Sequence, residues 1–266
     1  MAPRSGLVQW ERAEIARSRA QAAYRDVHPT SPSVLRRYAN PPADTWYPLE
    51  YVYHLIGDVR GQDVLDFGCG DGCNTALLAA RGCRISALDL SPDLLQQAAR
   101  RAVEDGVRNR VRFVCGSAHA IPLPDASVDL VVGNVMLHHL DLAAASREVL
   151  RVLRAGGRAI FREPIRQSRL MRALRPLIPY RQPNVSPYER PLLRSEIDAF
   201  SVPFERLRQR EFMLPFVRLA RTLGASKALD ARIVALDGRL LASHPWLRTY
   251  ATVIVFELRK PCPPAH

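Results

Sequence analysis

The chain has 266 residues, of which 47% are hydrophobic and 24% charged, and its formal net charge is +12. These proportions are those of a globular protein, and no apolar run approaches the ~18 residues that a membrane-spanning helix requires. The N-terminal residues lack the apolar stretch of a secretion signal, and the five cysteines show neither C-x-x-C nor metal-ligand spacing. We therefore expect a cytoplasmic protein with reduced cysteines and no metal.

Residues 1–60 form a predicted helical cap. Helices are expected over 9–27 and 47–59, and the proline-rich stretches 28–34 and 40–48 are expected to interrupt them.

From Asp63 onward, short apolar strands alternate with helices. Strands are predicted at 63–67, 84–90, 111–116, 127–134 and 157–163, with helices at 75–82, from Ser91 onward, and at 142–154. Ser91-Pro92-Asp93 combines a capping serine, a proline at the first helical position and an acid in the first turn. Strands rich in Val, Leu and Ile that alternate with helices indicate a doubly wound parallel sheet with both faces covered.

After Pro164 the alternation stops. Helical pieces are predicted at 168–177 and 194–200, a strand at 204–214, one or two helices over 216–242, and a last strand at 250–260 beside an antiparallel partner. We interpret residues 61–266 as one α/β domain with insertions at about 165–203 and 215–245.

The turn after the first strand contains three alternating glycines, Gly68, Gly70 and Gly72. Glycine allows positive φ and lets a ligand approach the backbone, and the following helix directs free N–H groups at that ligand. The dinucleotide fingerprint G-x-G-x-x-G is absent, because Cys73 stands where its last glycine would be, and there is no phosphate-loop Gly-Lys. Asp66 and Asp71 disfavour a pyrophosphate and favour a cationic ligand.

The second strand ends in Asp89, which is placed to accept hydrogen bonds from both ribose hydroxyls. A ribose without phosphates, carried by a ligand with positive charge, describes S-adenosylmethionine.

The motifs "VLDFGCGDG", "ALDLS", "GSAHAIPLPDASVDLVVGNVMLHHL" and "VLRAGGRAIFREP", taken in order, resemble those of class I S-adenosylmethionine-dependent methyltransferases over residues 60–165. The resemblance implies a Rossmann-like seven-stranded sheet whose last strand is antiparallel. It implies that Asp66, Gly68, Cys69 and Gly70 hold the methionine portion and Asp89 the ribose, while Leu90, Ser117 and Ala118 contact the adenine. Asn134 is a further cofactor-binding candidate. Many relatives carry an acid where this chain has Ser117, so the hydroxyl or the Ala118 backbone would have to replace that acceptor.

Methyl transfer requires alignment above all, and a base helps only where the acceptor must lose a proton. The candidate catalytic side chains after the fourth and fifth strands are His138, His139 and Glu163. A structural role in the loop, or an ion pair between Glu163 and a neighbouring arginine, explains the same residues equally well.

The acceptor pocket is predicted outside the cofactor core. Its candidate residues are Trp46, Tyr47 and Tyr51 in the cap and Arg166 and Arg169 after the sheet. Apolar residues mixed with arginine favour a small lipophilic or aromatic acceptor, anionic or amphipathic, that is methylated on oxygen.

Lysine occurs only twice, and ten arginines are crowded into residues 147–181. Such a run is most often a solvated face, but it is also compatible with an anionic substrate, peripheral contact with a membrane, or RNA. An RNA methyltransferase is therefore the second hypothesis, ranked lower because no appended RNA-binding module is seen, and no DNA partner is expected. A third hypothesis is a relative that catalyses a cyclisation or isomerisation without methyl transfer. The oligomeric state is left open.

Overall fold

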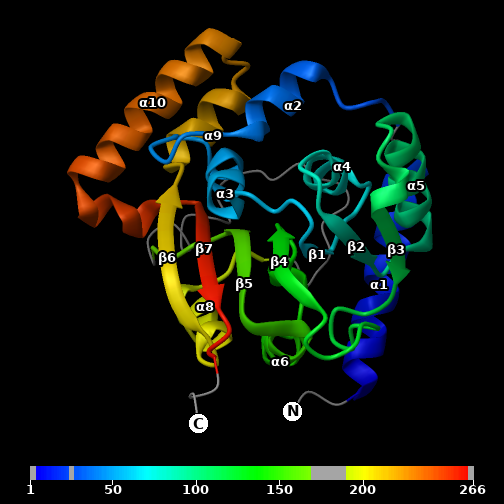
Figure 1. Ribbon diagram of the computed structural model, residues 1–266. Coiled ribbons are helices and arrows are strands. Elements are labelled where there is room, and N and C mark those ends of the chain that lie inside the picture. The colour runs from blue at the N-terminus through cyan, green and yellow to red at the C-terminus, as the bar shows by residue number, and fades with distance from the viewer. Residues whose placement is uncertain (1–3, 24–26, 169–189, 263–266) are drawn as a thin grey trace.

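The computed structural model describes residues 4–23, 27–168 and 190–262 (Figure 1). Three helices precede the sheet: α1 (Arg4–Ala23), α2 (Pro32–Ala39) and α3 (Pro48–Ile56). The first and third were predicted. The second was missed, although Ser31 caps it by accepting a hydrogen bond from the Val34 N–H and Pro32 opens it. Ser31-Pro32 is the same start signal as Ser91-Pro92.

The central sheet has seven strands in the order β3-β2-β1-β4-β5-β7-β6. Their bounds are β1 Asp63–Phe67, β2 Arg84–Asp89, β3 Val111–Cys115, β4 Val128–Asn134, β5 Leu153–Pro164, β6 Glu205–Phe212 and β7 Val253–Arg259. The first five strands are parallel, and β7 is antiparallel to both of its neighbours, β5 and β6. The predicted sheet, including its antiparallel last strand, is confirmed.

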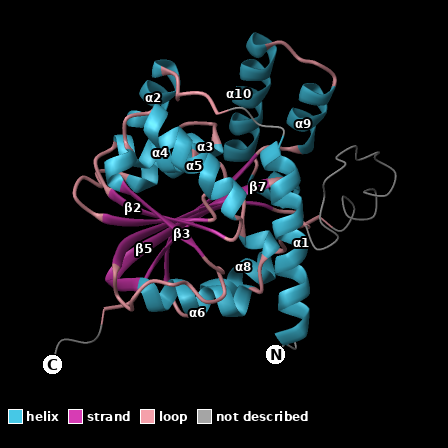
Figure 2. Cartoon of the chain, turned by 90° about the vertical axis from the view of Figure 1, so that its right-hand side faces the viewer, coloured by secondary structure: helices cyan, strands magenta, loops and turns pink. Residues whose placement is uncertain are grey.

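Helices cover both faces of the sheet (Figure 2). On one face lie α3, α4 (Cys73–Ala80) and α5 (Pro92–Glu104), and on the other lie α6 (Leu142–Val152) and α8 (Arg194–Ser201). Adjacent strand residues point to opposite faces, so Val64 joins the core under α3 to α5 while Leu65 joins the core under α6 and α8. Both side chains are at most 1% exposed, which explains the nearly continuous apolar strands in the sequence.

The late segment forms two helices, α9 (Pro215–Thr222) and α10 (Lys227–Ser243), which lie at the β6 side of the molecule (Figure 1). Gly238 in α10 packs against Trp46, so closely that a Cβ there would lie 2.0 Å from the indole ring. This contact joins the cap to the second late insertion. The predicted helical piece at 168–177 lies almost wholly outside the described residues.

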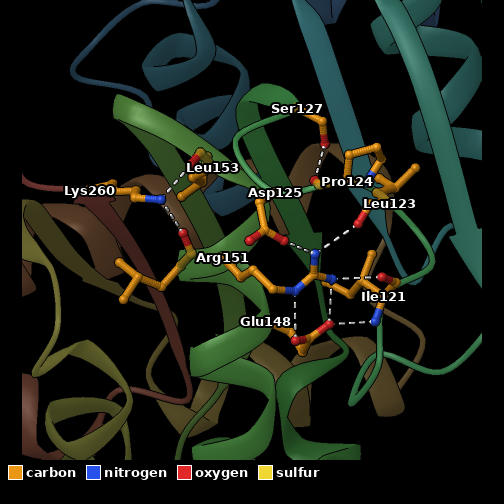
Figure 3. A network of polar contacts seen from close by, with 10 residues as sticks. Ile121, Leu123, Pro124, Asp125, Ser127, Glu148, Arg151, Leu153 and Lys260 are labelled. Carbon is orange, nitrogen blue, oxygen red and sulfur yellow. Dashed lines mark hydrogen bonds and ion pairs between the residues drawn. The ribbon is translucent and has the colours of Figure 1, made fainter.

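Several arginines in the described part of the arginine-rich run make contacts inside the fold. Arg151 of α6 donates hydrogen bonds to the carbonyl oxygens of Ile121 and Leu123, each within 2.8 Å, and pairs with Glu148 and Asp125 (Figure 3). These contacts fasten the connection between β3 and β4 to α6, and the two carboxylates raise the pKa of Arg151.

Two further arginines of the run make contacts of the same kind. Arg154 pairs with Asp63 and Asp129, and Arg158 pairs with the buried Glu257. Part of the positive charge noted in the sequence is thus used in ion pairs within the fold. No helix in the described ranges is both long and apolar enough to cross a membrane.

Candidate functional site

The glycine-rich turn joins β1 to α4 and is folded back onto β2. The N–H groups of Gly68 and Cys69 both donate to the Leu88 carbonyl oxygen, at 3.0 and 2.8 Å. Gly68, Gly70 and Gly72 have φ angles of 77°, 55° and 82°, which confirms that the turn needs glycine. At Gly72 a Cβ would also lie 2.7 Å from the Ala98 Cβ, so this turn packs directly on α5.

Asp89 at the end of β2 fixes the same turn from the other side. One carboxylate oxygen accepts the Gly70 N–H and the other accepts the Ser91 N–H, both at 2.9 Å. Burial raises the pKa of Asp89, and these N–H donors and the nearby charge of Arg17 oppose the increase. Each oxygen retains a lone pair for a ligand hydroxyl.

A cavity of about 310 Å³ lies over the turn and the ends of β2, β3 and β4. The residues that line it from the sheet side are Gly68, Cys69, Gly70, Asp71, Asn74, Leu88, Asp89, Leu90, Leu94, Gly116, Ser117, Ala118, His119, Asn134, Val135, Met136, His139 and Leu140. Helix α1 closes it from the other side with Glu11, Glu14, Arg17 and Ser18. The helix is fastened by polar contacts: Glu11 meets Ser117 and His119, and Arg19 pairs with Asp93 of α5.

Asp66 lies beneath the turn rather than in the cavity. It is 1% exposed, and its Oδ2 accepts a hydrogen bond from the Thr75 hydroxyl at 2.5 Å. Burial raises the pKa of Asp66 to about 7, against the lowering effect of the Thr75 bond, and the charge of Asp89 raises it further. Asp66 would therefore act on a ligand only through its electric field across the turn, and not by direct contact.

Glu163 is a fully buried anchor for the loop that follows β4. Its Oε1 accepts the N–H groups of Met136 and Leu137 at 2.9 and 2.8 Å, and its Oε2 lies 2.8 Å from His138 Nδ1. The loop begins with Val135 at φ 60°, an unfavourable conformation for a β-branched residue. The buried carboxylate thus holds a strained loop in place.

The two predicted histidines face different spaces. His138 is buried against Glu163 and lines a second cavity with residues of α6 and α8, among them Leu142 and Phe200. His139 lines the first cavity, where its Nδ1 lies 3.5 Å from Glu14 of α1. Of the three predicted catalytic side chains, only His139 belongs to the first cavity.

The three predicted aromatic residues of the cap do not line this cavity, and two of them, Trp46 and Tyr51, lie beside β6 or α10. Trp46 and Tyr51 flank the half-buried Arg210, whose guanidinium carbon is 5.4 and 5.2 Å from their ring centroids. Tyr47 lies under Arg37, at 4.6 Å. Burial lowers the pKa of Arg210, because the charged form loses part of its hydration, while Tyr51 and Asp44 oppose this effect.

Two arginines were predicted to bind the acceptor, and the structure adds a third, Arg162. The backbone N–H of Arg166 donates to the Leu192 carbonyl oxygen, and Arg169 lies outside the described residues. The structure instead brings Arg162 of β5 to the cavity edge, because its Nε donates to Asn134 Oδ1 at 2.5 Å. Burial lowers the pKa of Arg162, while the charge of Glu163 opposes that effect.

Most of the predicted cofactor residues meet in one cavity, with Asp66 below it. The contribution of α1 was missed, although the sequence held a signal: Glu11, Glu14 and Ser18 are spaced i, i+3 and i+7, which places polar side chains on one face of a helix. In the structure that face lines the cavity.

Comparison with known proteins gives this site a family context. Residues 65–161 match the family model described as "Methyltransferase domain". The chain is 35% identical over 102 residues to malonyl-acyl-carrier-protein O-methyltransferase of Serratia marcescens, a match that covers 38% of each chain. The chain thus spans about two fifths of the length of this curated relative.

Solved structures extend the likeness to the rest of the fold. A geranyl diphosphate C-methyltransferase from Streptomyces coelicolor A3(2) superposes with a TM-score of 0.61 at 15% identity, covering 94% of this chain and 98% of that one. The 4+2 cyclase SpnF superposes with a TM-score of 0.54 at 23% identity, covering 77% and 76%. Such distant matches establish a shared fold, and the fold alone does not separate methyl transfer from cyclisation.

Proposed function

We propose that this chain, which belongs to the class I S-adenosylmethionine-dependent methyltransferases, transfers a methyl group from S-adenosylmethionine to an oxygen of a small amphipathic acceptor. The observation that carries the proposal is the cavity over the glycine turn, with Asp89 at its wall. The matched methyltransferase domain covers the strands and turns that build this cavity.

The residues around the cavity fit the cofactor. Its size lies at the lower end of the ~300–1,000 Å³ of small-molecule sites. Asp89 suits ribose hydroxyls, Leu90 and Ala118 offer apolar surface to a purine, and Asp71 adds negative charge near the turn. A cationic ligand without phosphates would be bound well by such walls, whereas a pyrophosphate would meet carboxylates.

The bound cofactor would supply a methyl carbon activated by a neighbouring sulfonium. The chain's part is then to hold donor and acceptor in line and to keep the loop from Asn134 to His139 in place. Glu163 keeps this loop in place, because its carboxylate accepts hydrogen bonds from the N–H groups of Met136 and Leu137.

The acceptor is proposed to bind beyond the ends of β4 and β5. Arg162, beside Asn134, offers a buried cation next to the cofactor cavity, and Arg210 lies among Trp46, Tyr51 and Phe212. Cations partly stripped of water beside aromatic faces suit a molecule with an apolar body and an anionic or hydroxyl group.

A hydroxyl acceptor must lose its proton as the oxygen–carbon bond forms. His139 is the predicted catalytic residue that lines the cavity, so we assign it the role of general base. General bases contribute about 10²–10⁴-fold. If a His139→Gln variant keeps the full kcat, His139 is not the general base.

The RNA alternative has less support. Arg151, Arg154 and Arg158 are occupied by carboxylates and backbone carbonyl groups within the fold, so they do not form a continuous track for phosphates. Peripheral membrane contact stays a prediction, and its best support is the exposure of Leu219, Leu223 and Trp246 in and after α9 and α10.

The function is tested by incubating the protein with S-adenosylmethionine and a panel of hydroxylated amphipathic acceptors, followed by mass spectrometry. We expect a product heavier by one methyl group, together with S-adenosylhomocysteine. A product of unchanged mass, formed only in the presence of the protein, would support the cyclase or isomerase alternative instead.

Replacing Asp89 with alanine is expected to weaken S-adenosylhomocysteine binding by about 1.5–3 kcal/mol, or about ten- to a hundredfold, because hydrogen bonds to a charged group are lost. Isothermal titration calorimetry measures the effect. The matched control is Asp58→Ala, an exposed carboxylate in the loop before β1, which should bind normally. An unchanged dissociation constant for Asp89→Ala would mean that the ribose lies elsewhere.

A further inference from the structure

Ser117 stands at the turn that contacts the adenine in the proposed function, on which this inference rests. An adenine presents an exocyclic amino group, which is a hydrogen-bond donor and needs an acceptor. A serine hydroxyl can serve, but here it is already used: Ser117 Oγ donates to Glu11 Oε1 of α1 and accepts the His119 N–H. A carboxylate from a distant helix therefore occupies the position beside Ser117.

His119 holds the same carboxylate in a defined way. The Asp141 N–H donates to His119 Nε2 at 3.0 Å, so in the neutral ring the proton must be on Nδ1. Nδ1 lies 3.3 Å from Glu11 Oε1 and can donate to it. Ser117 and His119 thus orient Glu11 from the sheet side, although Glu11 belongs to the helix on the opposite wall of the cavity.

Both contacts use one oxygen of Glu11. Among the residues that the structure describes, no hydrogen bond is made to Oε2, and the Glu11 side chain is 29% exposed at the cavity wall. The apolar wall beside it includes Leu90 and Ala118. An oriented carboxylate with one oxygen available, next to an apolar slot for a flat ring, is a suitable acceptor for a ring amino group.

We propose that Glu11 of α1 recognises the exocyclic amino group of the cofactor's adenine and so supplies the acid that position 117 lacks. The strand end then contributes the orienting hydroxyl, and the cap helix contributes the charge. Because this hydrogen-bond acceptor belongs to α1, adenine recognition requires α1 to lie over the cavity. A 6-oxo purine would place a carbonyl oxygen against the carboxylate and be rejected.

The experiment is calorimetric and needs no acceptor. Binding of S-adenosylhomocysteine is compared with binding of its analogue in which purine replaces adenine, so that only the amino group is missing. We expect the wild-type chain to prefer the adenine compound by about ten- to a hundredfold. In Glu11→Ala this preference should disappear, through loss of affinity for S-adenosylhomocysteine and little change for the purine analogue.

Glu14→Ala is the matched control, because it removes the same charge from the same helix one turn away. It should retain the adenine preference whatever its overall affinity. If Glu11→Ala weakens both ligands equally, Glu11 only fastens α1, and the inference fails. The inference also fails if Glu11→Ala binds S-adenosylhomocysteine with the affinity of the wild-type chain. A wild-type chain that binds neither compound would instead refute the proposed function.

Discussion

Replacement of Glu163 by alanine is expected to lower the free energy of unfolding by about 3–5 kcal/mol, as measured by urea denaturation. The side chain is fully buried, and its loss leaves the N–H groups of Met136 and Leu137 and the ring of His138 without their acceptor. Each unsatisfied buried group costs about 1–3 kcal/mol. The strained turn at Val135 also loses the contact that holds the following residues.

The matched variant Glu163→Gln separates this cause from a simple loss of volume. Its amide oxygen can accept both backbone N–H groups, and its amide nitrogen can donate to His138 Nδ1 if the histidine proton moves to Nε2. We expect a cost of about 1 kcal/mol. An exposed carboxylate, Glu104, should tolerate alanine within about 0.5 kcal/mol. Equal destabilisation by alanine and glutamine would contradict the anchoring role.

The second large effect is a dependence of stability on pH that originates at Asp66. Burial raises the pKa of this carboxyl to about 7 in the folded protein, against an ordinary unfolded value of about 3.9. Because the folded value is the higher one, the stability contributed by the protonated form is fully present below about pH 4 and is lost as the pH rises through 7. At about 1.36 kcal/mol per pKa unit, the loss approaches about 4 kcal/mol.

Asp66→Asn isolates this contribution from those of all other carboxylates. The asparagine oxygen can still accept from Thr75, and the side chain carries no charge at any pH. Unfolding free energies of both proteins are measured between pH 4 and 8. As the pH rises, the free energy of unfolding of the variant should increase relative to that of the wild type, by up to about 4 kcal/mol. Parallel curves for the two proteins would show that Asp66 ionises normally.

The sheet was predictable because its signals are local. Most strands of the parallel half are short apolar runs, and the bounds of β1, Asp63–Phe67, were predicted to the residue. Strand β5 begins at Leu153, four residues before the predicted start. The start of α5 followed from Ser91, which does accept the Leu94 N–H. Periodicity and capping are properties of neighbouring residues, so the sequence displays them directly.

The cavity lining was predictable only where its residues belong to a strand end or to the turn directly after it. The sequence indicated that Asp89 and the glycine turn would lie together, because Asp89 ends β2 and the turn directly follows β1. The contact of Glu11 with this cavity was not predicted, because its partner Ser117 is 106 residues away in sequence. For the same reason, Glu163 was weighed as a catalyst, since nothing near it in the chain indicates that it is buried beneath the loop after β4.

The place of β7 between β5 and β6 has a consequence for biosynthesis. Strand β6 has β7 as its sheet neighbour and is made first, so a ribosome must add residues 213–252 before the connecting strand exists. Until then, the lateral edge of β5 and the whole of β6 present unpaired backbone groups. Nascent chains that stall in this interval leave these strand edges open to intermolecular pairing. Variants that weaken β7 should therefore reduce the yield of folded protein more than their effect on the finished fold would suggest, and chaperone co-expression should recover part of the loss.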